Sequence, residues 1–276
     1  MASQISTAGT ARVGLLVDAL KRHWPEYLME AGGLGLFMIS AALCTAVIQH
    51  PASPVRQAIA DPIFRRVLIG LAMGLTAIAI IYSPWGKQSG AHLNPAVTLT
   101  FCRLGQITFV DAFLYVLAQF AGGLTGVLLV AVVIRSTLAD PSVNFVTTVP
   151  GPRGAGVAFL AEALMSFGLM LTVLVVSNRQ QVARFTGLFA GLLVATYISV
   201  EAPLSGMSMN PARTLASALP AHLWTSLWVY FTAPPIGMLV AAEVYRRATG
   251  ARPIACPKLH HQNTFRCIFC GKPADA

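Results

Sequence analysis

Charged side chains are scarce in this sequence, because Asp, Glu, Lys and Arg together make up only 11% of its 276 residues. An ordinary soluble domain carries roughly 25% charged residues. Hydrophobic residues reach 55%, so there are too few polar side chains to cover a surface that faces water. This composition argues against a soluble domain and indicates that lipid is the solvent for most of the chain.

The N-terminal segment lacks the pattern of a signal peptide. Its apolar patch, residues 13–20, is short. Lys21 and Arg22 follow the patch instead of preceding it, and no small-residue cleavage site is correctly placed. We therefore expect residues 1–26 to form a cytoplasmic segment with a surface helix ahead of the first membrane span.

Six stretches are long and apolar enough to cross a membrane. About 20 helical residues, each rising 1.5 Å, span roughly 30 Å of hydrocarbon. The stretches are uncharged except for Glu162 in the fourth, and they lie within residues 31–48, 67–85, 112–134, 156–177 and 185–200 and between Arg213 and Glu243. The sequence therefore predicts an all-α integral membrane protein with six transmembrane helices.

Basic residues predict the orientation of these spans. An even number of spans places both termini on one side of the membrane. Most of the 19 lysines and arginines lie in the N-terminal segment, after the second span, between the fourth and fifth spans, and in the C-terminal tail. The positive-inside rule then places both termini in the cytoplasm, in a plasma or inner membrane. The net charge of +9 fits this asymmetry and anionic lipid, and no basic stripe interleaved with aromatic residues suggests nucleic-acid binding.

One polar motif occurs twice in this apolar chain. SGAHLNPAVTL (residues 89–99) and SGMSMNPARTL (residues 205–215) match in register, and Glu30 and Glu162 open equivalent spans. Each half contains three spans, so the second half must be inverted relative to the first. We expect repeats at about residues 27–134 and 156–245 within one domain, 27–245, followed by a cytoplasmic tail, 246–276. A duplicated helix pair of a soluble bundle is the alternative, and the span lengths argue against it.

Each motif has the signals of a helix start. Proline suits the first turn of a helix and asparagine is a favoured N-cap, so Asn94-Pro95 and Asn210-Pro211 should each begin a helix. The first ends near Cys102, and its length of roughly 13 Å spans about half the hydrocarbon. Inverted symmetry brings the two helix N-termini together at the midplane, each carrying about half a positive charge.

Two NPA boxes in inverted halves, the second followed by Arg213, resemble the aquaporin or major intrinsic protein family over roughly residues 27–245. The resemblance implies a passive channel for water and other small uncharged solutes that excludes protons and ions. It implies no enzymatic activity, no cofactor for transport, and a homotetramer in the lipid bilayer. The boxes, whose asparagine amides donate hydrogen bonds into the lumen, are Asn94, Pro95, Ala96, Asn210, Pro211 and Ala212.

The same resemblance implies a selectivity filter of Met73, Ile198, Met207 and Arg213. Gly74 is the alternative to Met73, because residues 83–85 include one extra residue relative to the usual pattern. Ordinary helix packing is the alternative for the three apolar residues, and a structural salt bridge is the alternative for the arginine. Ile198 replaces the histidine typical of water-selective members. A glycerol-, urea- or metalloid-type facilitator therefore stays open, although the aspartate of glycerol-selective members is also missing, since Thr214 follows the arginine.

The resemblance also assigns the polar residues near the loops. Glu30 and Glu162 would accept hydrogen bonds from the loops before the half-helices, with a proton relay as the alternative, and His92 would line the pore. A coupled secondary transporter would need further titratable groups at the midplane. A membrane enzyme would need a polar catalytic cluster. The sequence offers little for either, so both rank below a channel.

Cysteine and histidine gather in the C-terminal tail. Zinc prefers four such ligands, C-x2-C is a common half of a zinc site, and cytoplasmic thiols stay reduced. Either histidine can be the spare one, and a disordered basic tail or a lipidated cysteine is the alternative to a metal site. We expect the tail to be unrelated to the pore. Its candidate ligands are Cys256, His260, His261, Cys267 and Cys270.

Overall fold

A computed structural model describes residues 2–250 and 253–274, with side chains from Gly14 onward; Arg252, one of the basic residues used to predict orientation, lies outside them. Within the described part of the chain, six helices are long and apolar enough to cross a membrane, which confirms the predicted fold class. These helices are α1 (Ala2–Gln49), α3 (Pro62–Tyr82), α6 (Phe109–Ala139), α7 (Gly154–Ser177), α8 (Thr186–Ser205) and α10 (Leu227–Ala248).

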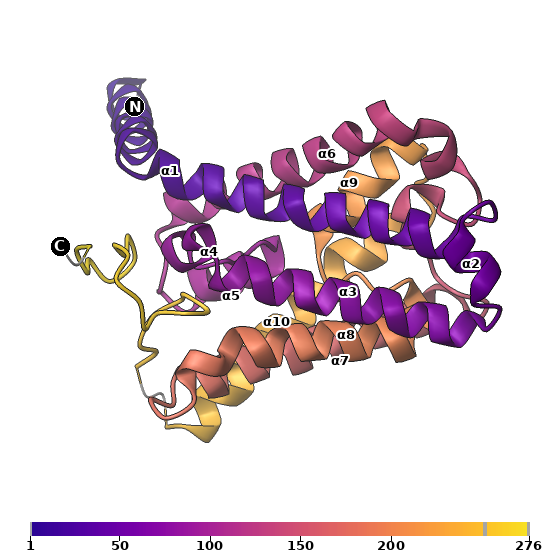
Figure 1. The fold of residues 1–276 in the computed structure, drawn as a ribbon. Helices are drawn as coiled ribbons and strands as arrows, with labels where there is room; N and C mark the ends of the chain where they lie inside the picture. Colours follow the sequence, from indigo (N-terminus) through magenta and orange to yellow (C-terminus); the bar gives the residue numbers. More distant parts are fainter. Residues whose placement is uncertain (1, 251–252, 275–276) are drawn as a thin grey trace.

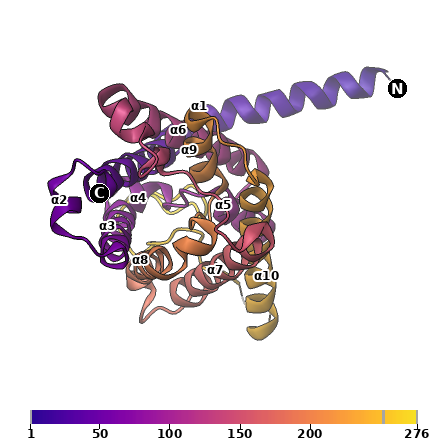
Figure 2. The ribbon, with the colours of Figure 1, turned by 90° about the vertical axis from the view of Figure 1, so that its right-hand side faces the viewer.

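Helix α1 is longer than the sequence suggests, because it contains both the expected surface helix and the first span. Pro25 lies inside it, and an internal proline removes a hydrogen bond and bends a helix. Figures 1 and 2 show the N-terminal part of α1 leaving the bundle at an angle. The expected surface helix and the first span are therefore one continuous helix, and the expected boundary at residue 26 falls inside α1.

The second span ends earlier than predicted. Helix α3 stops at Tyr82, and a short helix, α4 (Pro84–Ser89), follows it. The Ser83 hydroxyl accepts the backbone N–H of Gly86 at 3.1 Å and so caps α4, while Pro84 occupies its first turn. Residues 84 and 85, predicted as the end of the span, therefore begin the polar loop that leads to the first motif.

Both motifs begin short helices, α5 (Pro95–Arg103) and α9 (Pro211–Ala221). The Asn94 side chain accepts the backbone N–H of Ala96 at 2.9 Å, and Asn210 accepts that of Ala212 at 3.0 Å. Figure 1 shows α5 at the end of the bundle that carries the C-terminal tail and α9 at the opposite end. Figure 2, viewed along the bundle, shows the long helices as a ring around them. The remaining short elements are α2 (Pro54–Ala58), η1 (Asn144–Val146) and η2 (Ala183–Phe185).

Small residues let the long helices approach closely and in the same way in both halves. A Cβ atom on Gly122 of α6 would lie 2.0 Å from the Ala31 carbonyl oxygen of α1. A Cβ atom on Gly237 of α10 would lie 2.1 Å from the Ala163 carbonyl oxygen of α7. Close backbone contact at small residues is how helices associate in lipid, where the hydrophobic effect does not drive them together. The matched contacts place the loops of the two halves symmetrically.

We predict that Gly122→Ala destabilises the bundle, because the new methyl group would overlap the Ala31 carbonyl. Overpacking of this kind costs about 1–3 kcal/mol and should lower the unfolding temperature in detergent by roughly 3–10 °C. Gly156→Ala in α7 is the matched control, since nothing lies within 4 Å of its Cβ position. Equal unfolding temperatures for the two variants, followed by fluorescence-detected chromatography, would contradict the packing argument.

Candidate functional site

A cavity of about 450 Å³ runs through the centre of the bundle. Its walls come from α1, α3, α7 and α8 and from the two loops that precede α5 and α9. Most of the side chains on it are apolar, and the polar ones include the two asparagines where the loops meet. The sequence-predicted pore residues that line it are Met73, His92, Asn94, Ile198, Met207, Asn210 and Arg213.

The four residues expected in the filter lie on this cavity, and Arg213 has a backbone partner there. One of its guanidinium nitrogens donates to the Val146 carbonyl oxygen at 2.7 Å, so the loop between α6 and α7 fixes the side chain. Met73 is almost fully buried, with 2% exposure, and faces the cavity. Its neighbour Gly74 packs instead on α8, where a Cβ atom would lie 2.6 Å from the Gly191 carbonyl oxygen. The structure therefore places Met73, and not Gly74, on the cavity wall.

The two asparagines bind across the boundary between the halves. The side-chain amide of Asn94 donates to the Met209 carbonyl oxygen at 2.7 Å, and that of Asn210 donates to the Leu93 carbonyl oxygen at 2.8 Å. An asparagine amide carries two N–H donors, so each side chain keeps a second donor at the cavity that it lines. The sequence predicted that these amides donate hydrogen bonds into the lumen. Each amide also has a second role, because it joins its own half to the loop of the other half.

A buried glutamate holds each loop. Glu30 accepts the backbone N–H groups of His92 and Leu93, at 3.0 and 2.6 Å. Glu162 accepts the equivalent groups of Ser208 and Met209, at 2.8 and 2.6 Å. Both carboxylates are fully buried. An unpaired backbone N–H in lipid costs several kcal/mol, so these contacts are what permit an irregular chain at this depth.

The loops adopt the same unusual backbone shape. Ala91 and Leu93 in the first loop have positive φ angles of 54° and 51°, and Met207 and Met209 in the second have 52° and 54°. Left-handed conformations of non-glycine residues cost roughly 1 kcal/mol or more each and persist where the surroundings enforce them. The glutamate contacts supply that enforcement, and the resulting bends put polar backbone groups from both loops beside the cavity.

Two tyrosines, which the sequence analysis missed, complete this support. The Tyr115 hydroxyl donates to the Ser89 carbonyl oxygen at 2.8 Å, and the Tyr230 hydroxyl donates to the Ser205 carbonyl oxygen. Ser89 and Ser205 are the first residues of the two repeated motifs. Each tyrosine lies seven residues before the glycine of its helix crossing, Gly122 or Gly237. Aligning the two halves beyond the motifs would have revealed them.

This arrangement of inverted halves, capped half-helices and glutamate-held loops has counterparts among known proteins. Residues 20–245 match the family model described as "Major intrinsic protein". The chain belongs to this family.

Two plant proteins show how similar this major intrinsic protein is to its relatives in sequence. The chain is 39% identical over 176 residues to "Aquaporin NIP2-2" of Zea mays, covering 63% of this chain and 58% of that protein. It is 32% identical over 213 residues to "Aquaporin NIP6-1" of Arabidopsis thaliana, covering 76% and 64%. The matched region therefore spans less than two thirds of the length of these relatives.

A solved structure supports the fold. The X-ray structure of the aquaglyceroporin from Plasmodium falciparum superposes with a TM-score of 0.68, covering 82% of this chain and 97% of that one. The sequence identity is only 20%, so this similarity supports the fold of the chain and does not indicate which solute it transports.

The C-terminal tail lies beyond the family match and contacts the candidate pore, contrary to our expectation. Leu259 lines the cavity, and its backbone N–H donates to the Gly90 carbonyl oxygen at 3.1 Å. Nε2 of His92 lies 3.1 Å from the Pro257 carbonyl oxygen. The Phe269 ring stacks on the His92 ring, with centroids 5.7 Å apart. The prediction failed because no local pattern in the tail reveals a contact with a loop 165 residues earlier.

Four of the five candidate metal ligands come together in the tail. The ligand atoms of Cys256, His261, Cys267 and Cys270 all lie within 4.8 Å of one another. His260 is the spare histidine, because its ring packs against Tyr82 instead. The hydrogen bond between the two thiols lowers the pKa of Cys267 and raises the pKa of Cys256, and a hydrogen bond from His261 lowers the pKa of Cys267 further. Deprotonated thiols are the form that binds metal.

The spacing of these atoms suits a metal ion better than a disulfide. The sulfur atoms of Cys256 and Cys267 are 3.5 Å apart, and Cys270 Sγ lies 3.9 Å from Nε2 of His261. A disulfide needs about 2.05 Å between sulfur atoms. Tetrahedral zinc, with bonds of about 2.3 Å to sulfur and 2.0–2.1 Å to nitrogen, needs ligand separations of about 3.5–3.8 Å. These two separations are therefore close to those that tetrahedral zinc requires, and the other ligand atoms lie within 4.8 Å of one another.

We predict that Glu162→Gln destabilises the loop before α9. An amide presents an N–H where the carboxylate presents an oxygen, so the backbone N–H of Ser208 or of Met209 loses its acceptor. An unsatisfied buried donor costs about 1–3 kcal/mol, and the unfolding temperature in detergent should fall by roughly 3–10 °C. Glu243→Gln on the exposed surface of α10 is the control. Unchanged unfolding of Glu162→Gln would show that the carboxylate does not hold the loop.

Proposed function

We propose that this major intrinsic protein is a passive channel that conducts water and small uncharged solutes and excludes protons and ions. The observation that carries the proposal is the meeting of two capped half-helices, through Asn94 and Asn210, on one central cavity. The plant relatives named as aquaporins agree with it. The proposed pore residues are the two NPA boxes, His92 and the filter of Met73, Ile198, Met207 and Arg213.

Exclusion of protons follows from the direction of the donors at the midplane. Each half-helix points its positive end at the cavity, and each asparagine offers an N–H there. A water molecule that accepts hydrogen bonds from both sides cannot keep the donor–acceptor order that a proton wire requires. Arg213 adds a fixed positive charge further along the cavity and repels cations. The chain needs no moving part and no cofactor for this selectivity.

The wall of the proposed filter favours solutes other than water as well. Met73, Ile198 and Met207 present apolar surfaces, and methionine adapts its shape to what passes. Water gains no hydrogen bond from such a wall, so its advantage over a small neutral solute is reduced. A facilitator of glycerol, urea or metalloid type with little water selectivity is therefore the second candidate.

The glutamates argue against a coupled transporter. Glu30 accepts four hydrogen bonds, from Ser89, His92, Leu93 and Gln119, and both its oxygens are in use. Glu162 accepts three, from Ser205, Ser208 and Met209. A carboxylate so occupied suits loop support more than proton exchange. We therefore assign both residues to holding the loops.

Three further properties belong to the same proposal. The basic residues at the tail end of the bundle support cytoplasmic termini in a plasma or inner membrane. We propose a homotetramer, as the family resemblance implies, with residues 27–245 forming the channel domain. We also propose that Cys256, His261, Cys267 and Cys270 hold zinc, which transport would not require and which would tie together the tail, residues 246–276.

We predict that Ile198→His makes the channel more selective for water. Histidine narrows the filter and offers a hydrogen bond to water, so the ratio of glycerol to water permeability should fall at least about fivefold. The measurement is osmotic shrinkage of proteoliposomes in sucrose, glycerol and urea gradients, with a membrane-permeant chelator present because the tail lies against the cavity. Val200→Ala, on the exposed face of the same helix, is the control. Chelated wild-type protein that passes water no faster than empty liposomes contradicts a water channel.

We predict that the purified chain binds about one zinc ion. His261→Ala should lose most of the metal because it removes one of four ligands, while His260→Ala, its neighbour outside the cluster, should keep it. Metal analysis measures the content. The thiolate absorption of a cobalt-substituted sample reports the ligands directly. Equal metal content in the two histidine variants would rule out this ligand set.

A further inference from the structure

The tail occupies the space in front of the pore mouth nearest to it. In Figure 1 the yellow segment lies beside α4 and α5, and in Figure 2 it crosses behind the centre of the helix ring. Both views agree with the contacts of Leu259, which is bonded to Gly90 and lines the cavity. A solute leaving the cavity on this side must therefore pass the tail.

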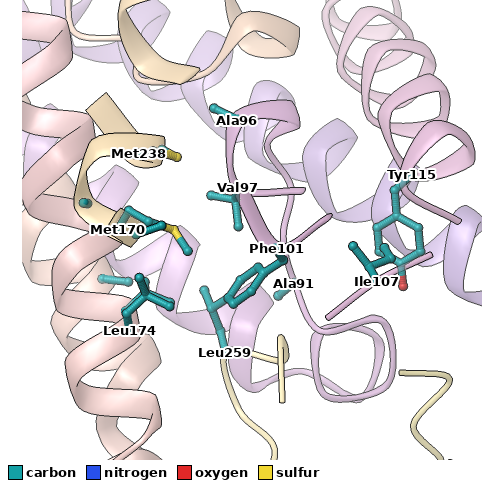
Figure 3. Close-up of a cluster of buried hydrophobic side chains, with 14 of the residues drawn as sticks. Ala91, Ala96, Val97, Phe101, Ile107, Tyr115, Met170, Leu174, Met238 and Leu259 are labelled. Carbon is teal, nitrogen blue, oxygen red and sulfur yellow. The ribbon is translucent and has the colours of Figure 1, made fainter. Parts of the chain in front are cut away.

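Two apolar side chains of the tail pack at this end. Leu259 is buried in a cluster that includes Ala91 and Phe101 beside the cavity (Figure 3). Phe269 lies flat on the ring of His92, the histidine that lines the cavity, and packs edge-on against Tyr115. The Pro257 carbonyl lies within hydrogen-bond distance of the same histidine. The tail thus covers both the apolar wall and the polar group that a passing water molecule would use.

Polar contacts fasten the tail to the bundle at two points. The Arg266 guanidinium donates to both carboxylate oxygens of Glu26 in α1, each at 2.7 Å. Nζ of Lys258 is buried and donates to the Lys87 carbonyl oxygen at 2.9 Å. It also donates to the Arg266 carbonyl oxygen at 2.6 Å, which joins the two fastening points. A buried lysine with two carbonyl partners is a built contact and not a chance encounter at the surface.

The shape of the tail depends on the four-ligand cluster. The described part of the tail, residues 253–274, contains no helix or strand, so few backbone hydrogen bonds oppose its conformational entropy. The four tail residues that contact the bundle lie between the first ligand, Cys256, and the last, Cys270. They are Lys258, Leu259, Arg266 and Phe269. A metal ion that joins these ligands closes the segment into a compact loop and fixes the sealing and fastening residues relative to one another.

We propose that metal bound by Cys256, His261, Cys267 and Cys270 clamps the tail as a seal over this mouth of the pore. When the metal leaves, the tail loses its shape and the pore opens. The inference rests on the proposed channel function, and it names zinc-type metal availability as the signal that regulates conduction. A metal that binds only the folded tail, at 100 times its dissociation constant, favours the sealed state by about 100-fold.

The test measures the full-length protein in liposomes with zinc and with a membrane-permeant chelator. Osmotic shrinkage should be at least about tenfold faster after chelation, and added zinc should reverse the change. His261→Ala should shrink fast in both conditions, whereas His260→Ala should respond like the wild type. The double variant Leu259→Ala/Phe269→Ala should keep its zinc and conduct while loaded. Protease cleavage within residues 253–274 gives a second readout that is independent of transport, and it should accelerate on chelation.

The outcomes separate this proposal from the channel itself. Fast shrinkage of the wild type that is equal with zinc and with chelator would falsify the seal and leave the channel standing. Zinc binding that slows proteolysis of the tail without slowing water flow would also contradict the seal and leave the channel standing. Failure of chelated wild type, His261→Ala and Leu259→Ala/Phe269→Ala alike to conduct any tested solute would instead count against the channel. Because chelation acts on wild-type protein, misfolding of a variant does not prevent the test.

Discussion

Glu30 and Glu162 each hold a stretch of irregular backbone at membrane depth, where lipid offers no hydrogen bond to an exposed N–H. Each carboxylate accepts two consecutive backbone N–H groups and a serine hydroxyl. Without these acceptors the left-handed residues of the loops would relax, and the half-helices would have no fixed starting point. The position of Asn94 and Asn210 therefore depends on groups that do not themselves line the cavity.

The two halves are joined at the place where they are most irregular. Asn94 caps α5 with its oxygen and donates to the Met209 carbonyl with its nitrogen, and Asn210 caps α9 and donates to the Leu93 carbonyl in the same way. One side chain thus ends a loop, starts a helix and ties that helix to the other half. The symmetry is broken one residue past each box, where buried Val97 corresponds to Arg213. This single difference gives the second half-helix a positively charged side chain that the first half-helix lacks.

The features that could be predicted from the sequence are those that depend on residues close together in the chain. Proline in the first turn and an asparagine cap place the starts of both half-helices. The apolar runs show where the spans lie but not all of their ends, because α1 begins well before its run and the run between Arg213 and Glu243 covers most of α9 as well as most of α10. The buried glutamates stand out because charge is rare in these spans. By contrast, the choice of His261 over His260 depends on which side chain reaches Tyr82. The docking of the tail depends on Glu26, Gly90 and His92, and no spacing within the tail refers to them.

The two mouths of the bundle are covered in different ways at equivalent positions. Gly90 has a φ of +99°, and a Cβ there would lie 3.2 Å from Lys258 and 3.3 Å from Phe269 of the tail. Gly206, its counterpart, has a φ of +79°, and a Cβ there would lie 3.0 Å from Thr148 in the loop between α6 and α7. That loop joins two helices of the bundle, α6 and α7, whereas the tail follows the last of the long helices, α10. The cover at the first mouth is held by side-chain contacts of Lys258 and Arg266 and contains the four-ligand cluster, so a metal signal that controls the pore would act at that mouth.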